Sequence, residues 1–337
     1  MIKSAHQTLR YIILGLIAFF VYTIPTYALT ITPVRIEIKG DPGQVLTEEM
    51  TLINEQSTSA TFYSSYANFE AQGDTGTPSF TSASEGIATW MKTADSITLG
   101  PNETKTISIS IAIPKDTTPG GYFGAIFWGT APESDKPGEV AISAKTGMLV
   151  LLSVNGDVKE AGGLVDFKTK ENKFWYNTLP VSFEYRFKND GGDRVKPTGT
   201  ITIRNTVYLR ADRIDANPVQ GNVLPASTRK FKVDWIKYSD PDGAPLAASA
   251  MKKFLHTVRY QWKNFAFGLY SAHIDIAYGV QQQHAKDVVR FFVFPWQLLI
   301  CIIVAGICIR WIGKKALHHY NKLIIARARG SEYDDAQ

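Results

Sequence analysis

Apolar and polar residues alternate in short runs through most of the chain between Thr30 and Phe294, which is the period of half-buried β-strands. Ile107–Ile113 places isoleucine at every second position, and Val181–Lys188 repeats the pattern with Val, Phe, Tyr and Phe. Turn sequences such as Gly40–Gly43 and Gly100–Glu103 separate the runs. Many short strands with few intervening helices predict an all-β fold of Ig-like β-sandwich type.

The strand pattern occurs twice, which predicts two tandem Ig-like domains over residues 29–156 and 157–292. In each copy a tyrosine follows a glycine just ahead of a late strand: Tyr122 in the first copy and Tyr270 in the second. A tyrosine in that position can turn its hydroxyl back to the main chain, so both residues are candidates for a tyrosine corner.

Two stretches depart from the strand pattern. Residues 247–258 carry apolar side chains at i, i+3 and i+4 spacing, which predicts a short amphipathic helix inserted in the second domain. Residues 69–86 are rich in Gly, Ser and Thr and are interpreted as a loop, which is long for a compact domain.

Residues 293–312 are almost entirely apolar and predict a transmembrane helix, because twenty helical residues match a hydrocarbon core of roughly 30 Å. Trp296 and Trp311 suit the two interfaces, and Lys314 and Lys315 open a basic tail, residues 313–337, on the cytoplasmic side. The tail either lies on anionic lipid or only sets the topology.

The N-terminal 28 residues predict a signal peptide, with Lys3 and Arg10 ahead of an apolar run and a small-x-small site ending at Ala28. An uncleaved helix is the competing interpretation. Either way, we expect a single-pass membrane protein with most of the chain extracytoplasmic and the C-terminus cytoplasmic; a cleaved signal peptide makes it type I. The lipid bilayer is then its first partner.

The formal net charge of +5 comes from the two ends of the chain. Between Leu29 and Val289 there are 27 Lys and Arg against 28 Asp and Glu, so the exported part is nearly neutral. A nucleic-acid-binding domain concentrates basic residues on its fold, and we therefore expect no nucleic-acid partner.

Catalytic and metal-binding patterns are missing from the sequence. Both cysteines, Cys301 and Cys308, lie inside the predicted span, so the exported part has no disulfide and no thiolate site. Hydrolase, nucleotide-binding and metalloprotease motifs are absent. His273 and Asp275 share a strand face, but a solvated pair is favoured over a catalytic one. We expect no enzyme activity, no cofactor and no metal.

Three consecutive aromatics, Phe174, Trp175 and Tyr176, are the strongest candidates for recognition. Alternation cannot bury all three against one core, so at least one is expected to be exposed or to lie at a domain interface. Packing between the domains and contact with a protein or glycan partner are the two interpretations.

Several motifs occupy turn and strand-edge positions: Thr32–Pro33–Val34–Arg35, Pro42–Gly43–Gln44, Asn54, Leu99–Gly100–Pro101, Ile113–Pro114 and Pro119–Ile126. Together they resemble the WxL-interacting protein family of bacterial surfaces. The resemblance implies a signal peptide, two Ig-like domains, one transmembrane helix and a basic tail. It also implies a first domain associated with peptidoglycan and a second that binds partner or host proteins.

The leading hypothesis is therefore a non-enzymatic, membrane-anchored envelope protein that binds cell-wall polymer or other surface proteins. The alternative is a periplasmic-type assembly chaperone that adds a strand to a secreted subunit at an open sheet edge. The first domain is also distantly similar to pilus chaperones, with Arg35 on its first strand. This alternative requires an unpaired, apolar edge strand.

Overall fold

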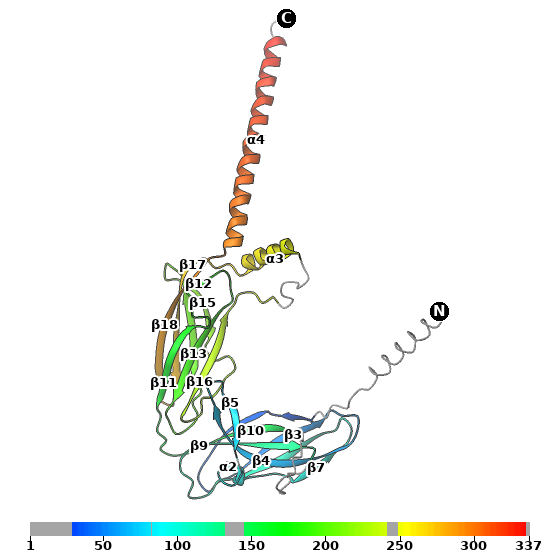
Figure 1. The fold of residues 1–337 in the computed structure, drawn as a ribbon, viewed down its shortest axis with the longest axis vertical. Coiled ribbons are helices and arrows are strands. Elements are labelled where there is room, and N and C mark those ends of the chain that lie inside the picture. The colour runs from blue at the N-terminus through cyan, green and yellow to red at the C-terminus, as the bar shows by residue number, and fades with distance from the viewer. Residues whose placement is uncertain (1–28, 82, 132–144, 241–248, 335–337) are drawn as a thin grey trace, which may run out of the picture. The chain divides into compact units, whose positions relative to one another are not determined.

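The computed structural model describes residues 29–81, 83–131, 145–240 and 249–334, and side chains as far as residue 322. The predicted signal peptide and its cleavage point lie outside these residues. The chain divides into two compact units (Figure 1). Unit 1 runs to Lys159 without residues 73–77, and unit 2 contains Gly73–Thr77 and Glu160 onward.

Unit 1 is a sandwich of two sheets. The first has the order β1-β3-β8-β6, and the second has the order β2-β10-β9-β4-β5 with β7 also paired to β4. The strands are β1 (Leu29–Thr32), β2 (Arg35–Gly40), β3 (Val45–Asn54), β4 (Ala60–Gln72), β5 (Thr77–Thr81), β6 (Met91–Lys92), β7 (Ser96–Leu99), β8 (Thr104–Ala112), β9 (Gly120–Gly129) and β10 (Lys145–Val154). One short helix, α2 (Ile87–Trp90), lies between β5 and β6.

Unit 2 repeats this arrangement with a three-stranded sheet, β11-β13-β16, and a five-stranded sheet, β12-β18-β17-β14-β15. Its strands are β11 (Gly162–Thr169), β12 (Trp175–Tyr176), β13 (Val181–Asn189), β14 (Thr198–Arg204), β15 (Arg210–Asp215), β16 (Ser227–Trp235), β17 (Gly268–Tyr278) and β18 (Gln283–Val293). Two helices complete it, α3 (Ala250–Lys263) and α4 (Trp296–Asp334).

The first two strands of each unit pair in the same way. β1 pairs antiparallel with β3, and after Pro33 the chain enters the other sheet, where β2 pairs parallel with β10. In unit 2, β11 pairs antiparallel with β13, and β12 pairs parallel with β18. The all-β class with two Ig-like sandwiches and a C-terminal apolar helix is thereby confirmed.

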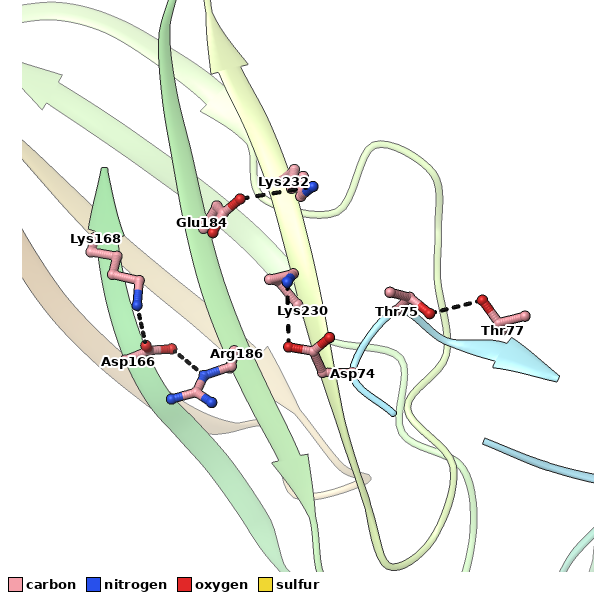
Figure 2. Close-up of polar contacts among 9 residues, drawn as sticks. All are labelled: Asp74, Thr75, Thr77, Asp166, Lys168, Glu184, Arg186, Lys230 and Lys232. Carbon is pink, nitrogen blue, oxygen red and sulfur yellow. Dashed lines mark hydrogen bonds and ion pairs between the residues drawn. The ribbon is translucent and has the colours of Figure 1, made fainter. Parts of the chain in front are cut away.

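Each core is filled by the inward positions of the alternating strands. In unit 1, Ile109 and Ile111 of β8 are fully buried with Trp128 of β9. In unit 2, Phe183 and Tyr185 of β13 are fully buried with Trp235 of β16. The polar alternates of β11, β13 and β16 form cross-strand ion pairs, and Figure 2 shows Asp166 between Lys168 and Arg186.

A buried asparagine ends the third strand of each unit, β3 and β13. The Asn54 amide nitrogen donates to the carbonyl oxygens of Leu99 and Gly100, at 3.2 and 2.8 Å. The Asn189 amide nitrogen donates to the carbonyl oxygens of Asp193 and Val223, at 2.7 and 2.9 Å. Both side chains are buried and tie together the backbone carbonyl groups of neighbouring turns.

The segment interpreted as a loop over residues 69–86 is largely ordered structure instead. β4 continues to Gln72, β5 returns beside it, and α2 follows. Phe80 holds the strands together by packing its ring against Phe127, with centroids 4.9 Å apart. The tip of this hairpin, Gly73–Thr77, belongs to unit 2, where Asp74 forms an ion pair with Lys230 at 3.4 Å (Figure 2).

Both helices of unit 2 differ from the predicted boundaries. The described part of α3 runs from Ala250 to Lys263, five residues beyond the predicted end, because Val258 is followed by Trp262 on the same face. Val293, predicted to begin the span, ends β18 instead, because Trp175 and Tyr176 pair with Phe292 and Val293.

The C-terminal helix α4 begins at Trp296 and continues unbroken past Ile312. Its segment Trp296–Lys322, 27 residues with a mean hydropathy of 1.9, is long and apolar enough to cross a membrane. Within the part of the chain that the structure describes, no second helix meets this criterion. Cys301 and Cys308 lie on this segment as free thiols.

Candidate functional site

The three candidate aromatics lie where unit 2 passes into α4. β12 pairs parallel with the end of β18, and the backbone N–H of Phe292 donates to the carbonyl oxygen of Phe174 at 2.7 Å. The N–H of Phe294 donates to the carbonyl oxygen of Tyr176 at 2.8 Å. Only Phe294 and Pro295 separate β18 from α4.

The pleat divides the aromatic triplet between two faces. Tyr176 turns inward, where its ring meets the fully buried Phe291 edge-on at 6.0 Å. Trp175 turns outward and is 63% exposed. Its ring packs against Phe292, with centroids 4.7 Å apart, and also contacts Phe174.

Further rings extend this surface around the start of α4. Phe267 lies 6.4 Å from Phe292 and 6.0 Å from Phe294, measured between ring centroids. We name the group the aromatic collar: Phe174, Trp175, Phe267, Phe292 and Phe294. Rings held this way by strand pairing keep their positions without a partner, so the collar is a preformed apolar surface.

Besides the aromatic collar, α3 also contacts the first turn of α4. Gln261 of α3 is buried, and its side-chain oxygen accepts the backbone N–H of Leu298 at 2.9 Å. Its amide nitrogen donates to the carbonyl oxygen of Asn177, at 3.2 Å, and to the side chain of Gln297. Figure 1 shows α3 lying beside the base of α4.

Arg35 lies on β2, away from the collar residues in sequence and in the other unit. Its guanidinium forms an ion pair with Glu37 at 3.2 Å, two residues along the same strand. Among the described residues, β2 pairs with Leu149–Val154 of β10, and no strand pairs with Thr146–Met148 on that side. The open stretch of β10 is thus three residues long.

The other outer strands of unit 1 give little room for strand addition. β1, β5, β6 and β7 have between two and five residues each. Short outer strands are a common protection against edge-to-edge pairing. β2 is the outermost strand of its own sheet, so among the described residues the open edge that the chaperone hypothesis requires consists of β2 and the short stretch of β10 beyond it.

The tyrosine-corner candidates differ in geometry. The Tyr122 hydroxyl donates to the carbonyl oxygen of Thr118 at 2.9 Å, four residues upstream, which is corner geometry. The Tyr270 hydroxyl instead accepts the N–H of Phe267 at 3.3 Å. Tyr270 packs inside the core against Trp235 and Phe291. Burial raises the pKa of both tyrosines.

His273 and Asp275 have separate partners rather than forming a joint site. His273 contacts the Ser271 hydroxyl at 3.0 Å, and burial lowers its pKa, with the charges of Arg204 and Arg290 adding to the effect. Asp275 contacts His284 at 2.7 Å and Lys286 at 3.1 Å. The hydrogen bond from His284 lowers the pKa of Asp275, and Lys286 adds to this shift against burial. Among the described residues, no three His, Cys, Asp or Glu side chains form a metal-binding group.

Sequence reasoning missed one part of this end of unit 2. The turn between β14 and β15 exposes Val207, Tyr208 and Leu209, each more than 60% accessible. The Thr206 hydroxyl donates to the carbonyl oxygen of Leu269 at 3.1 Å, which places the turn beside the start of β17. Three consecutive apolar residues in a turn, where polar residues predominate, were the available signal.

No family model and no curated relative matches this chain. Solved structures of similar topology include the class 5 fimbriae chaperone CfaA, at 10% identity and a TM-score of 0.37, covering 78% of this chain and 99% of that one. A chain of the CsuC–CsuE chaperone–tip subunit pre-assembly complex from Acinetobacter baumannii gives 11% identity, a TM-score of 0.34, and coverage of 79% and 99%. The E. coli chaperone DraB gives 11%, 0.33, and coverage of 79% and 97%. No functional role follows from similarities this low.

Proposed function

We propose that this chain is a non-enzymatic, membrane-anchored envelope protein that binds other surface components, as its resemblance to the WxL-interacting family implies. The aromatic collar around the start of α4 is the observation that carries the proposal. Its partner is cell-wall polymer or another envelope protein. The chain is oriented with both sandwiches extracytoplasmic and its C-terminus cytoplasmic.

The join between β18 and α4 supports the anchoring half of this proposal. Two residues are too few to act as a flexible linker, and Gln261 further fixes the first turn of α4. Unit 2 would therefore be held against the bilayer, with little freedom to swing.

The exposed rings of the collar support the binding half. Aromatic side chains contribute strongly to interfaces when they are desolvated by a partner. Trp175 is the most exposed ring of the collar, and it is supported from behind by Phe292. A ring that is exposed yet fixed in position loses little conformational freedom on binding.

The test uses the full-length chain in lipid nanodiscs, exposed to purified peptidoglycan sacculi and to envelope proteins. We expect retention of one of these, at least ~10-fold weaker after Trp175→Ala, because a loss of about 1.4 kcal/mol is tenfold. Val219→Ser is the matched control, since Val219 is an exposed apolar residue of unit 2 outside the collar. Failure to retain either material would contradict the binding proposal.

The anchoring proposal is tested separately. Membranes from producing cells are washed with alkaline carbonate, which removes peripheral proteins. The full-length chain should stay in the pellet. Its release into the supernatant would contradict a transmembrane α4.

The second candidate function is assembly by strand addition, and the open stretch of β10 favours it. Leu149 donates its N–H to the carbonyl oxygen of Val34, so the alternation of the strand turns the N–H of Gly147 toward the side that β2 leaves uncovered. An incoming strand could extend the pairing of β2 along this stretch.

Arg35→Ala tests this second function. Arg35 lies on β2, the strand that an incoming segment would extend, so client recovery should fall if β2 helps to hold the client. Lys39→Ala, near the other end of the same strand, is the control. Equal client recovery with the two variants would contradict client binding at this edge.

A further inference from the structure

The amphipathic helix α3 exposes its apolar face instead of burying it. Met251, Leu255, Val258 and Trp262 follow i, i+4, i+7 and i+11 spacing, which places them on one face of the helix. Met251, Leu255 and Trp262 are 67%, 56% and 66% exposed. The face that was expected from periodicity therefore exists, but the sandwich does not cover it.

The position of α3 is tied to the start of α4. Gln261 satisfies the N–H of Leu298 in the first turn of α4, and the neighbouring side chain of Gln297 also contacts it. The apolar segment of α4 begins at Trp296. α3 therefore lies at the level where the predicted membrane span begins.

The charges beside the apolar face have one sign. At about 100° per residue, Lys252, Arg259 and Lys263 lie next to it on the side away from Gln261. The described helix carries no acidic residue. An apolar stripe containing Trp and bordered by Lys and Arg is typical of helices that lie in the interface of a bilayer.

A second exposed apolar segment lies at the same end of unit 2. The Val207–Leu209 turn is joined to the start of β17 by the bond between Thr206 and Leu269. β17 follows directly on Phe267 of the collar. α3 and this turn therefore both expose apolar side chains at the end of unit 2 from which α4 leaves.

We propose that α3 is a membrane-surface helix, with Met251, Leu255, Val258 and Trp262 inserted in the lipid headgroup layer on the side from which α4 enters. This inference rests on the proposed function, since it requires α4 to span the bilayer. A lipid surface is favoured over a protein partner because the bilayer is already present at this level and because the flanking charges suit anionic headgroups.

The test places a nitroxide label at single positions of the full-length chain in nanodiscs of phosphatidylcholine and phosphatidylglycerol. Cys301→Ser and Cys308→Ser remove the native thiols. Leu255→Cys reports on the apolar face of α3. Lys253→Cys is the matched control, because it lies about 160° around the same helix. Ile303→Cys reports on α4.

Collision with oxygen and with a water-soluble nickel complex distinguishes lipid from water at each label. We expect the label at 255 to collide with nickel several-fold less often than the label at 253, and to resemble the label at 303 in favouring oxygen. Equal nickel collision at 255 and 253, with 303 protected, would overturn the surface helix and leave the anchor standing. A nickel-accessible label at 303 would overturn both proposals.

Discussion

The side-chain oxygen of Gln261 in α3 accepts the backbone N–H of Leu298 in α4 at a distance of 2.9 Å. The first N–H groups of a helix have no partner within the helix, so this contact works as a cap supplied from another element. The Gln261 amide nitrogen also donates to the carbonyl oxygen of Asn177, just after β12. One buried side chain thus connects α3, α4 and the strand that carries Trp175.

Gln261→Ala should loosen this junction. The change leaves the N–H of Leu298 and the carbonyl of Asn177 without their partner, and each buried unsatisfied group costs about 1–3 kcal/mol. We expect faster amide exchange across α3 and in the first turn of α4, measured on the full-length chain in micelles.

Lys253→Ala is the control for this prediction, because Lys253 is an exposed residue of the same helix. Unchanged exchange in both variants would mean that packing, and not Gln261, holds α3 in place.

The buried asparagines should be costly to remove in both units. Asn54→Ala and Asn189→Ala each remove at least two buried or part-buried hydrogen bonds to turn carbonyl groups, so we expect unfolding free energies about 2–4 kcal/mol lower. Urea unfolding followed by tryptophan fluorescence measures the change, since each unit has a buried tryptophan, Trp128 or Trp235.

Asn102→Gly is the matched control. Asn102 is exposed and has a φ of 53°, a conformation that glycine adopts freely, so its replacement should be neutral. Equal effects at Asn102 and Asn54 would show that turn conformation, and not the buried hydrogen bonds, determines stability.

The alternation of apolar and polar residues predicted the two sandwiches, because every second residue of a strand lies on the same face of the sheet. The same reasoning could not find Asn54 and Asn189 as stabilising groups, since their value depends on carbonyls brought close by the fold. Nor could it predict which of the three consecutive aromatics points into the core, because the inward orientation of Tyr176 is set by its pairing with Val293.

Helical periodicity in α3 showed which residues share a face but not what covers that face. Leu255 and Trp262 satisfy the same pattern whether they pack on a sandwich or remain exposed.

The hairpin of β4 and β5 escaped prediction for a related reason. Its Gly, Ser and Thr residues hide the strand period, and the rings that hold it, Phe69, Phe80 and Phe127, meet only in the folded chain.

Tyr122→Phe isolates one hydrogen bond of unit 1. The ring packing against Trp90 is kept, with centroids 4.7 Å apart, while the bond from the hydroxyl to the Thr118 carbonyl is lost. We expect unit 1 to unfold about 1 kcal/mol more easily in urea. Thr118→Ala should have no effect, because it keeps the carbonyl that accepts the bond. A loss with Thr118→Ala as large as with Tyr122→Phe would point to the turn itself.

Asp166 should make unit 2 sensitive to acid. Burial alone raises its pKa, but hydrogen bonds and charges from Arg186 and Lys168 outweigh burial and hold the pKa below its ordinary value of 3.8. A carboxylate with a lowered folded-state pKa stabilises the fold above its unfolded pKa, and this contribution is lost as the pH falls through the folded-state value.

Asp166→Asn should therefore lower stability at pH 6–7, by no more than about 1 kcal/mol because the partners are largely exposed. The difference from the unmodified chain should shrink below about pH 4. Urea unfolding at several pH values measures this, with Asp234→Asn, at an exposed position of β16, as a control that should change little. A difference that stays constant down to pH 2 would show that Asp166 acts through packing and not through its charge.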